Sequence, residues 1–356
     1  MCKKSFSFFI FWMPFNICIA QSFSTIQDFV KTKTDSLFDK NKLPGMMVVI
    51  NDGTTESFYT KGYANTETKT VFDINTIFEA GSITKTYTAF VVESVLREYK
   101  IKETEIIFAY LPDSVKVNKS LSNITFLSLL NHTSGLPRLP SNFDIATGDM
   151  QPYKFYTEDK LYTYLKSADI KNESKVEYSN LGAALAGVLA CKISKKTYMQ
   201  LLEKYIFSPF KIKNEETGLA KNKNKSQGYF DKDKVDYWDM NILMPAGGLK
   251  CSGKEMMNYL QKISNPTNEA TKKLVDSLLS PTASMNARIR IARAWHTYEQ
   301  KDKAIVYWHN GGTYGFSTFV GFVRGTNKKV LVVINKFNAN NSADFIGISI
   351  MKKLLE

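Results

Sequence analysis

Two residues of complementary chemistry stand three positions apart in the segment FEAGSITKTYTAF, residues 78–90. Ser82 carries a hydroxyl that can attack a carbonyl carbon, and Lys85 carries an amine. One helical turn brings such an amine beside the hydroxyl, because residues i and i+3 share a helix face. A lysine among apolar neighbours loses part of its preference for the proton and can then act as a base. The pair therefore predicts a nucleophilic serine at a helix start with a lysine that helps to take its proton.

The Ser-x-x-Lys spacing alone is a weak signal, because the chain contains it three times. Ser208 to Lys211 includes a proline and is interpreted as a loop. Ser349 to Lys352 falls in the closing helix, where Lys352 is interpreted as a solvated residue. Taken singly, each copy is better explained as structural, so the choice of Ser82 depends on its context.

A second group of polar residues, Tyr178-Ser179-Asn180, precedes the apolar run LGAALAGVLA. A tyrosine hydroxyl at such a place can relay a proton, and an asparagine amide can bind a substrate carbonyl. The structural alternative is a buried aromatic ring with a satisfied hydroxyl for Tyr178 and a helix cap for Asn180. The residues themselves leave both interpretations open.

A third group, His309-Asn310-Gly311-Gly312-Thr313, follows a predicted strand. Adjacent glycines let a substrate approach the backbone, so that a strand N–H can complete an oxyanion hole. The alternative is a tight hairpin that needs glycine for its backbone angles.

The helices and strands that must position these groups are distributed unevenly along the chain. Apolar periodicity and turn residues predict helices and strands at both ends and mainly helices between them, with Thr125, Ser179 and Ser252 at helix starts. The pattern predicts an α+β fold, in which an antiparallel sheet built from both chain ends is flanked by helices and carries an inserted all-helical domain. The α/β part is expected at about 21–82 and 286–356, and the helical insert at about 83–285. The predicted helices are 24–40 and 344–355, and the predicted strands are 46–51, 57–64, 291–299, 305–309, 316–324 and 329–335.

The first twenty residues, MCKKSFSFFIFWMPFNICIA, predict a secretory signal peptide with cleavage before Gln21. An uncleaved anchor is the alternative. Cleavage lowers the net charge from +13 to +11 and leaves two cysteines, Cys191 and Cys251, whose pairing the sequence does not decide. A periplasmic or secreted protein of this charge suits an anionic cell envelope as a neighbour. No nucleic-acid partner and no membrane span after signal cleavage are expected, because the body of the chain has no 18-residue apolar run and no basic helix with interleaved aromatics.

The three groups, in this order, resemble the boxes of the serine β-lactamase and penicillin-binding-protein superfamily. The match is to its class C-like branch, which includes D-alanyl-D-alanine carboxypeptidases, D-amino-acid amidases and carboxylesterases. The flanking segments LLNHTSGLP (129–137), PAGGLKCSGKEMMNYL (245–260) and HNGGTYGFST (309–318) are similar as well, and the resemblance covers about residues 25–355.

The resemblance implies a role for each residue of the boxes. Ser82 would be the acylated nucleophile, Lys85 would help to take its proton, and Tyr178 would pass a proton to the leaving group and later activate water. Asn180 would position the substrate amide, and the backbone N–H groups of Ser82 and Gly312 would form the oxyanion hole. No metal or organic cofactor is needed for this chemistry.

One position departs from many β-lactamases of the family, which have lysine where this chain has His309. An imidazole is mostly neutral near pH 7, whereas a lysine is a permanent cation suited to a substrate carboxylate. His309 and Gly311 are still expected to contact substrate, and Arg138 or Arg324 is a candidate for the missing charge. His132 is interpreted as structural.

The resemblance thus implies an exported serine hydrolase acting on a D-amino-acid peptide, a peptidoglycan-type peptide or a carboxylic ester. One alternative is a β-lactamase that hydrolyses β-lactam antibiotics. The other is a non-catalytic module of the same fold that binds the envelope or senses β-lactams. The residues that shape the cleft are expected to come from segments 138–175 and about 210–245. These segments carry the aromatic residues Tyr153, Phe155, Tyr156, Tyr229, Tyr237 and Trp238 but no diagnostic motif.

Overall fold

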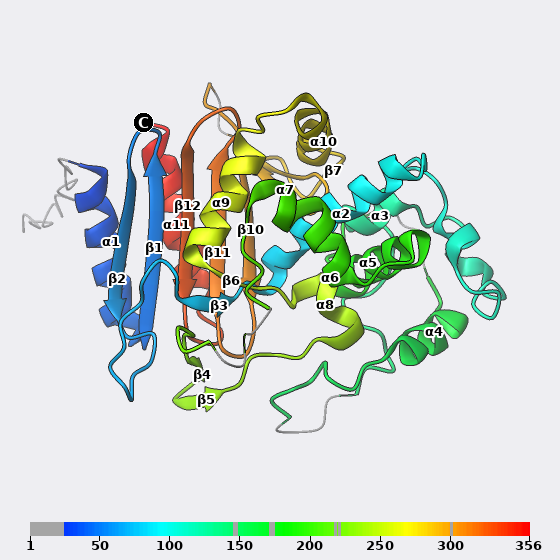
Figure 1. Ribbon diagram of the computed structural model, residues 1–356, viewed down its shortest axis with the longest axis horizontal. Coiled ribbons are helices and arrows are strands. Elements are labelled where there is room, and N and C mark those ends of the chain that lie inside the picture. Colours follow the sequence, from blue (N-terminus) through cyan, green and yellow to red (C-terminus); the bar gives the residue numbers. More distant parts are fainter. Residues whose placement is uncertain (1–24, 145–148, 171–174, 217–218, 220–221, 300–301) are drawn as a thin grey trace, which may run out of the picture.

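The computed structural model describes residues 25–144, 149–170, 175–216, 219, 222–299 and 302–356. The predicted signal peptide, residues 1–20, lies outside the described residues. An eight-stranded sheet stands beside a group of helices (Figure 1). The blue and red ends of the described chain lie on the sheet side, and the green middle of the chain makes most of the helical side.

Both ends of the chain contribute strands to this sheet. Its strand order is β2-β1-β12-β11-β10-β9-β8-β7, and every neighbouring pair is antiparallel. The two ends meet where β1 pairs with β12, with Met46 opposite Ile334. The predicted α+β class, with an antiparallel sheet built from both chain ends, is confirmed. The strands are β1 (Gly45–Asp52), β2 (Glu56–Gly62), β7 (Ala283–Ser284), β8 (Ile289–Ile291), β9 (His296–Tyr298), β10 (Val306–Gly312), β11 (Ser317–Val323) and β12 (Lys328–Ile334).

The central strands are apolar on both faces because both faces are covered. Helix α11 (Asn340–Leu354) packs on β11 and β12, and α1 (Ile26–Asn41) packs on α11 and β2. Met46 and Val48 of β1 join the apolar cluster on this side, whereas Met47 and Val49 join the cluster shared with the helical part. Helix α9 (Gly253–Ser264) contacts β11 and β12 as well. This two-sided burial explains the unbroken apolar run of β1 in the sequence.

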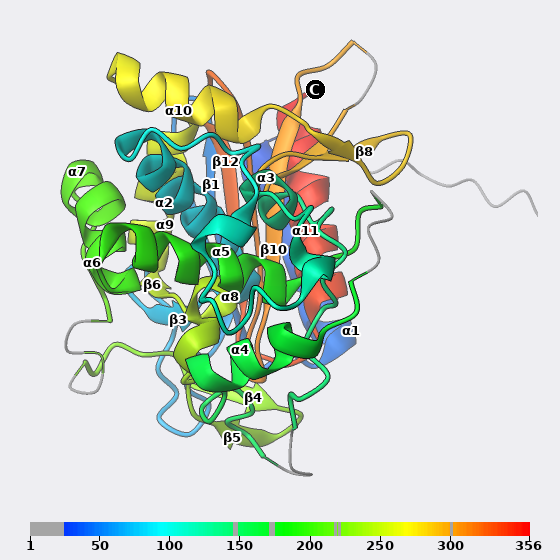
Figure 2. The same ribbon diagram turned by 90° about the vertical axis from the view of Figure 1, so that its right-hand side faces the viewer.

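The helical part is centred on two helices, α2 (Thr84–Glu98) and α5 (Asn180–Ser194), which pack against each other. Helix α5 is apolar almost all round, as expected of a helix enclosed by its neighbours. Figure 2 looks onto this side, with α3, α4 and α5 toward the viewer. The remaining helices are α3 (Phe126–Leu130), α4 (Glu158–Ser167), α6 (Tyr198–Leu202), α7 (Ser208–Phe210), α8 (Met244–Gly247) and α10 (Glu269–Leu279).

Within residues 83–285, where the sequence predicts an all-helical insert, the structure has short strands as well as helices. Strands β4 (Gly228–Phe230) and β5 (Asp233–Val235) make a hairpin, and β6 (Lys250–Ser252) pairs with β3 (Ile77–Glu79). Strands of three residues are too short to show a two-residue period. They form because of pairing partners that can lie far away in the chain, as β3 and β6 do.

The predicted strand 291–299 is a hairpin instead. Strand β8 ends at Ile291 and β9 begins at His296, with a hydrogen bond from the Ala292 nitrogen to the Trp295 carbonyl at 2.8 Å. Ala294 has φ 62°, in the left-handed region. Alanine rarely adopts this conformation, so the turn has no sequence signature.

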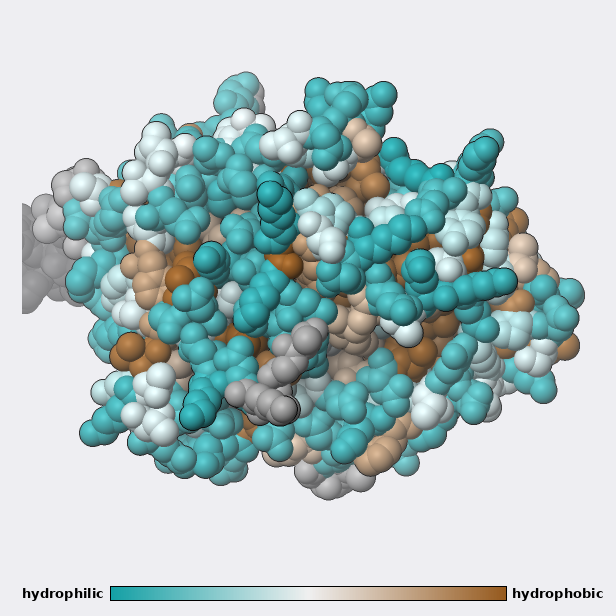
Figure 3. Space-filling model, viewed as in Figure 1, coloured by the Kyte–Doolittle hydropathy of each residue, from teal (hydrophilic) through white to brown (hydrophobic). Residues whose placement is uncertain are grey.

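Helix starts follow the predicted caps in three cases. The side chains of Thr125, Ser179 and Ser252 accept hydrogen bonds from the first turns of α3, α5 and α9. None of the described helices is long and apolar enough to cross a bilayer. The view in Figure 3 shows a mainly hydrophilic face with apolar residues in small separate groups. Cys191 and Cys251 are both free thiols.

Candidate active site

Ser82 lies in the 3₁₀ turn that leads directly into α2, as its position before an apolar helix predicts. Gly81 has φ 56°, and a Cβ atom added there would lie 2.6 Å from the Gly312 nitrogen. A Cβ atom at Gly311 would lie 2.1 Å from the Ala80 carbonyl oxygen. Glycine at these positions lets the serine turn touch the end of β10, which brings two segments 230 positions apart into one site.

Lys85 lies below this turn and is 1 % exposed. Its Nζ donates hydrogen bonds to Ser82 Oγ at 3.0 Å and to the Ala246 carbonyl oxygen at 2.5 Å. Burial lowers the pKa of Lys85 well below its usual value, and the charge of Arg138 acts in the same direction. A lowered pKa makes the neutral amine more accessible, and in that form Lys85 can accept the serine proton at this distance.

Tyr178 precedes α5 and completes a compact group with Ser82 and Lys85. The centroid of its ring lies 4.9 Å from Lys85 Nζ. Burial raises the pKa of Tyr178 to about 12, although a hydrogen bond with Ser82 opposes this shift. The phenol therefore keeps its proton at neutral pH, next to both Ser82 and Lys85.

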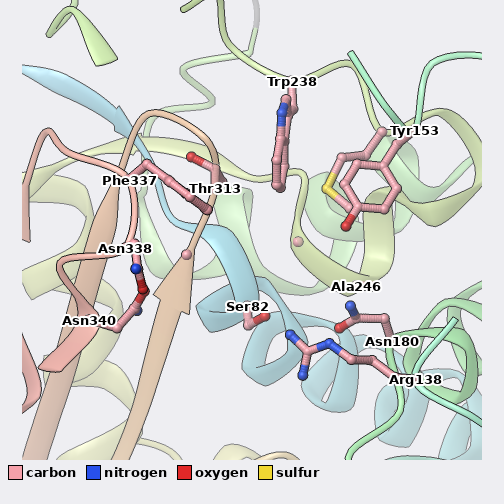
Figure 4. Close-up of a pocket in the computed structure, with 13 residues that line it drawn as sticks. Ser82, Arg138, Tyr153, Asn180, Trp238, Ala246, Thr313, Phe337, Asn338 and Asn340 are labelled. Carbon is pink, nitrogen blue, oxygen red and sulfur yellow. The ribbon is translucent and has the colours of Figure 1, made fainter. Parts of the chain in front are cut away.

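Asn180 is the first residue of α5, and Ser179 fixes this helix start. Ser179 Oγ accepts a hydrogen bond from the Gly182 nitrogen at 2.8 Å and donates one to the Pro137 carbonyl oxygen at 2.7 Å. The Oδ1 atom of Asn180 is buried and has no hydrogen-bond partner among the described residues. Figure 4 shows the Asn180 side chain near Ser82 and Arg138. A buried acceptor without a partner can bind a substrate N–H.

Two cavities open beside Ser82, and we name each after one residue of its wall. The Asn180 cavity, of about 210 Å³, also has Tyr153, Trp238 and Thr313 on its wall. The Tyr178 cavity, of about 320 Å³, has His296, Trp308, Asn310 and Gly311. Both cavities share Ser82, Arg138, Gly312 and Asn340. Tyr153 and Trp238 come from the two aromatic-rich segments that the sequence singles out.

His309 is buried beside Tyr178 and is not among the residues that line either cavity. The two rings are 6.4 Å apart between centroids, and His309 Nδ1 is 2.6 Å from the Asn310 carbonyl oxygen. Burial lowers the pKa of His309 well below its usual value, so the imidazole is neutral. Of the predicted site residues, the structure brings Ser82, Lys85, Tyr178, Asn180, Gly311 and Gly312 together, and it places His309 behind Tyr178.

The other two histidines of the chain lie in the same region. The ring of His132 is 4.5 Å from that of Tyr178, and its Nδ1 accepts a hydrogen bond from the Ser179 nitrogen at 3.2 Å. The ring of His296 is 5.2 Å from that of His309. Burial lowers the pKa of both, that of His296 to about 4. His132 thus supports the loop that carries Tyr178.

A buried carboxyl group, Glu79, lies behind the Asn180 cavity and has no motif that predicts it. It accepts hydrogen bonds from Thr313 Oγ1 at 2.7 Å and from the Trp238 nitrogen at 2.5 Å, and both of these residues line the cavity. Burial raises the pKa of Glu79 to about 7. Asn340, likewise missed, donates a hydrogen bond to the Gly311 carbonyl oxygen at 2.6 Å.

The other Ser-x-x-Lys copies line neither cavity. Ser208 begins the short helix α7, where the following proline is tolerated in the first turn, and its hydroxyl donates to Glu203. This corrects the predicted loop. Lys352 extends from α11 over the ring of Tyr298. Ser82 therefore differs from Ser208 and Ser349 in that it lines both cavities.

Comparisons with known proteins agree with this arrangement. The family model described as Beta-lactamase matches residues 24–352. A beta-lactamase of Providencia stuartii is 28 % identical over 246 residues, which cover 67 % of this chain and 60 % of the relative. The D-alanyl-D-alanine-carboxypeptidase/endopeptidase AmpH of Escherichia coli is 23 % identical over 238 residues, which cover 66 % of this chain and 61 % of the relative. The chain thus aligns with less than two thirds of the length of these relatives.

The fold agrees with a solved structure. The crystal structure of a class C beta lactamase from Rhodobacter sphaeroides superimposes with a TM-score of 0.77 at 18 % sequence identity, over 91 % of this chain and 98 % of that one. At this identity the likeness concerns the fold. Because the family model matches nearly the whole described chain, the protein belongs to the beta-lactamase family.

Proposed function

We propose that this protein cleaves an amide or ester through an acyl-enzyme on Ser82, and that D-amino-acid peptides, peptidoglycan-type peptides or carboxylic esters are its substrates. The observation that carries the proposal is the 3.0 Å contact between Lys85 Nζ and Ser82 Oγ, with Ser82 on the wall of two cavities. A nucleophile and a base within hydrogen-bond distance, open to a ligand, are the minimum needed for acyl transfer.

In the acylation step, Ser82 Oγ attacks the substrate carbonyl carbon while its proton moves to the amine of Lys85. The carbonyl oxygen gains negative charge, which the backbone N–H groups of Ser82 and Gly312 stabilise. When the tetrahedral intermediate collapses, the bond to the leaving nitrogen or oxygen breaks. Tyr178 gives its phenolic proton to that atom and recovers a proton from the Lys85 ammonium, so that protons balance and the acyl group stays on Ser82.

In the deacylation step, a water attacks the acyl-enzyme carbonyl from the side of Tyr178. Its proton passes through Tyr178 and Lys85 to Ser82 Oγ, which leaves as the free hydroxyl, and the product is a carboxylic acid. Asn180 supports both steps, because its unpaired Oδ1 can hold an N–H of the substrate.

The test is covalent labelling of the full chain with a fluorescent fluorophosphonate, followed by intact-protein mass measurement. We expect one adduct, on Ser82, and loss of labelling in Ser82→Ala. Ser208→Ala is the matched control, because it removes the serine of another Ser-x-x-Lys copy and should label as the parent does. Equal labelling of Ser82→Ala and the parent would contradict the proposal, and so would failure of every ester, amide and lactam tried, which would favour a non-catalytic module.

A second candidate function is β-lactam hydrolysis, which the beta-lactamase of Providencia stuartii among the relatives favours. It requires fast deacylation, so sustained turnover of a chromogenic cephalosporin supports it. A stable adduct with the same compound supports the peptidase or esterase function. The neutral His309, in place of a cationic lysine, gives the peptide or ester function more weight.

We also propose that the protein acts outside the cytoplasm, in the periplasm or as a secreted enzyme, near an anionic envelope. Support comes from the basic and apolar character of residues 1–20 and from the positive net charge. Cell fractionation with N-terminal sequencing tests this, and the expected result is a mature chain beginning at Gln21 in the exported fraction. A full-length cytoplasmic protein would contradict it.

A further inference from the structure

The two cavities beside Ser82 share a single cation, Arg138. No aspartate or glutamate is among the described residues that line either cavity. The other wall groups are hydroxyls, amides, a thioether, aromatic rings and backbone, and the wall residue His296 is neutral. Arg138 is therefore the one formal charge on these walls, within the part of the chain that the structure describes.

The backbone of Arg138 is fixed to the start of α5. Its carbonyl oxygen accepts hydrogen bonds from the nitrogens of Asn180 and Leu181, at 3.0 and 3.3 Å. The guanidinium carbon lies 5.2 Å from the centroid of the Tyr178 ring, and Figure 4 shows the guanidinium pointing toward Ser82. This anchoring, together with the cation–π contact, keeps the charge beside the nucleophile although the side chain is exposed.

The guanidinium of Arg138 also lacks a carboxylate partner among the described residues, unlike those of Arg293 and Arg324. Arg293 pairs with Glu103, and Arg324 pairs with Asp276 away from both cavities. A guanidinium left unpaired in a concave site retains its capacity for two parallel hydrogen bonds to an incoming carboxylate.

We propose that Arg138 is a specificity-determining residue that binds a carboxylate group of the substrate; this inference rests on the acyl-enzyme function proposed above. The substrate would then be an amide or ester that also carries a free carboxylate, such as a peptide with its terminal or side-chain acid. The cation comes from the loop that follows α3, whereas His309 of β10 is neutral and is not among the residues that line either cavity. Because Arg138 borders both cavities, the carboxylate can belong to the acyl fragment or to the leaving fragment.

Matched aryl esters distinguish these two positions. One ester carries a carboxylate at the end of the acyl group, a second carries it at the meta position of the leaving phenol, and each is paired with its carboxamide. We expect the parent enzyme to favour one carboxylate ester over its carboxamide by about tenfold or more in kcat/KM. Arg138→Gln should abolish this ratio, and Arg138→Lys should restore part of it. Arg324→Gln, which removes a charge outside the cavities, should retain the full ratio.

The ratio of kcat/KM between a carboxylate ester and its carboxamide distinguishes binding of the carboxylate by Arg138 from a general electrostatic effect of its charge. The charge of Arg138 also lowers the pKa of Lys85 and acts in the same direction on Tyr178, and a loss of that effect would shift the pH profiles of the carboxylate and carboxamide esters alike. If the parent acylates at Ser82 but prefers neither carboxylate ester, or if Arg138→Gln keeps the preference, the inference is wrong and the proposed function stands. If no ester acylates Ser82, the inference is wrong, and the fluorophosphonate labelling of the parent and of Ser82→Ala decides whether the proposed function stands.

Discussion

The hydroxyl of Thr313 donates a 2.7 Å hydrogen bond to the carboxyl group of Glu79, and both side chains are buried. Thr313 follows Gly312, whose backbone belongs to the proposed oxyanion hole, and Glu79 stands three residues before Ser82. Glu79 also accepts a hydrogen bond from the Trp238 nitrogen. One carboxyl group thus joins the nucleophile segment, the end of β10 and the aromatic wall of the Asn180 cavity.

The protonation of Glu79 predicts a pH-dependent stability. Burial raises its pKa to about 7 from an ordinary 4.5, so between these values the folded chain binds more protons than the unfolded chain. The contribution of this residue to the free energy of unfolding therefore falls as pH rises from about 4.5 to 7, by roughly 3 kcal/mol in total. Glu79→Gln, which cannot titrate, should show a smaller fall over this range. Urea unfolding of both proteins at pH 5 and pH 7.5 measures the difference, and identical pH slopes would contradict the prediction.

Removal of the base should affect chemistry far more than folding. Lys85→Met should slow acylation by about 10²- to 10⁴-fold, because the serine proton then has no acceptor. In the parent, acylation should reach its plateau well below pH 10, because burial lowers the pKa of Lys85. Lys329→Met is the matched control, since Lys329 is 2 % exposed and lies in β12 away from the cavities. Stopped-flow acylation kinetics provide the measurement, and an unaltered rate in Lys85→Met would assign the base to another group.

Close contact between β10 and the serine turn predicts that Gly311→Ala is damaging in two ways. The added methyl group would overlap the Ala80 carbonyl oxygen, so the strand must move away from the turn, at a cost of about 1–3 kcal/mol or more. Acylation should fall with it, because the oxyanion site loses its geometry. Gly325→Ala meets no atom within 4 Å but has φ 77°, so it should cost about 1 kcal/mol and leave acylation intact. Equal acylation losses in the two variants would argue that the contact has no special role.

The cap of α5 provides a test of how Tyr178 and Asn180 are positioned. Ser179→Ala removes the hydrogen bonds to the Gly182 nitrogen and the Pro137 carbonyl oxygen, and should cost about 1–2 kcal/mol. Because Tyr178 and Asn180 flank this residue, acylation should also slow by about 10- to 100-fold. Thr197→Ala, which removes the cap of α6, should lose similar stability without the kinetic effect. Equal kinetic losses in the two variants would mean that the effect is global.

Much of the sheet follows from local patterns. The apolar runs of β1 and β12 and the caps Thr125, Ser179 and Ser252 are local signals, and the structure places the elements within a few residues of their predicted limits. The exceptions have physical causes. Strands β3 and β6 hold three residues each and depend on a distant partner, and the turn at Ala294 uses a conformation that alanine rarely adopts.

The residues of the candidate site also include some that local sequence signals predict and others that they do not. Ser82 and Lys85 lie at a helix start, where their spacing alone brings the side chains together. Tyr178 and Asn180 lie at the start of α5, and the packing of α5 on α2 brings them to Ser82. Glu79, Asn340 and the cation of Arg138 enter the site through contacts between segments up to about 230 positions apart, for which a single sequence carries no local signal. The orientation of His309 depends on which face of β10 is covered by Tyr178, and spacing does not determine this either.

The pairing of β1 with β12 has a consequence for how the protein is made. Asp52 lies opposite Lys328, so during synthesis the first hairpin must wait for almost the whole chain before its open edge is paired. Until then, a strongly apolar strand exposes unpaired N–H and C=O groups, which is the kind of edge that promotes aggregation. Because β10 and β12 are both made late, the proposed active site forms late as well. A chain truncated before residue 306 would lack the strand that completes the proposed oxyanion hole. Slow folding, dominated by non-local pairing, is therefore expected of this molecule.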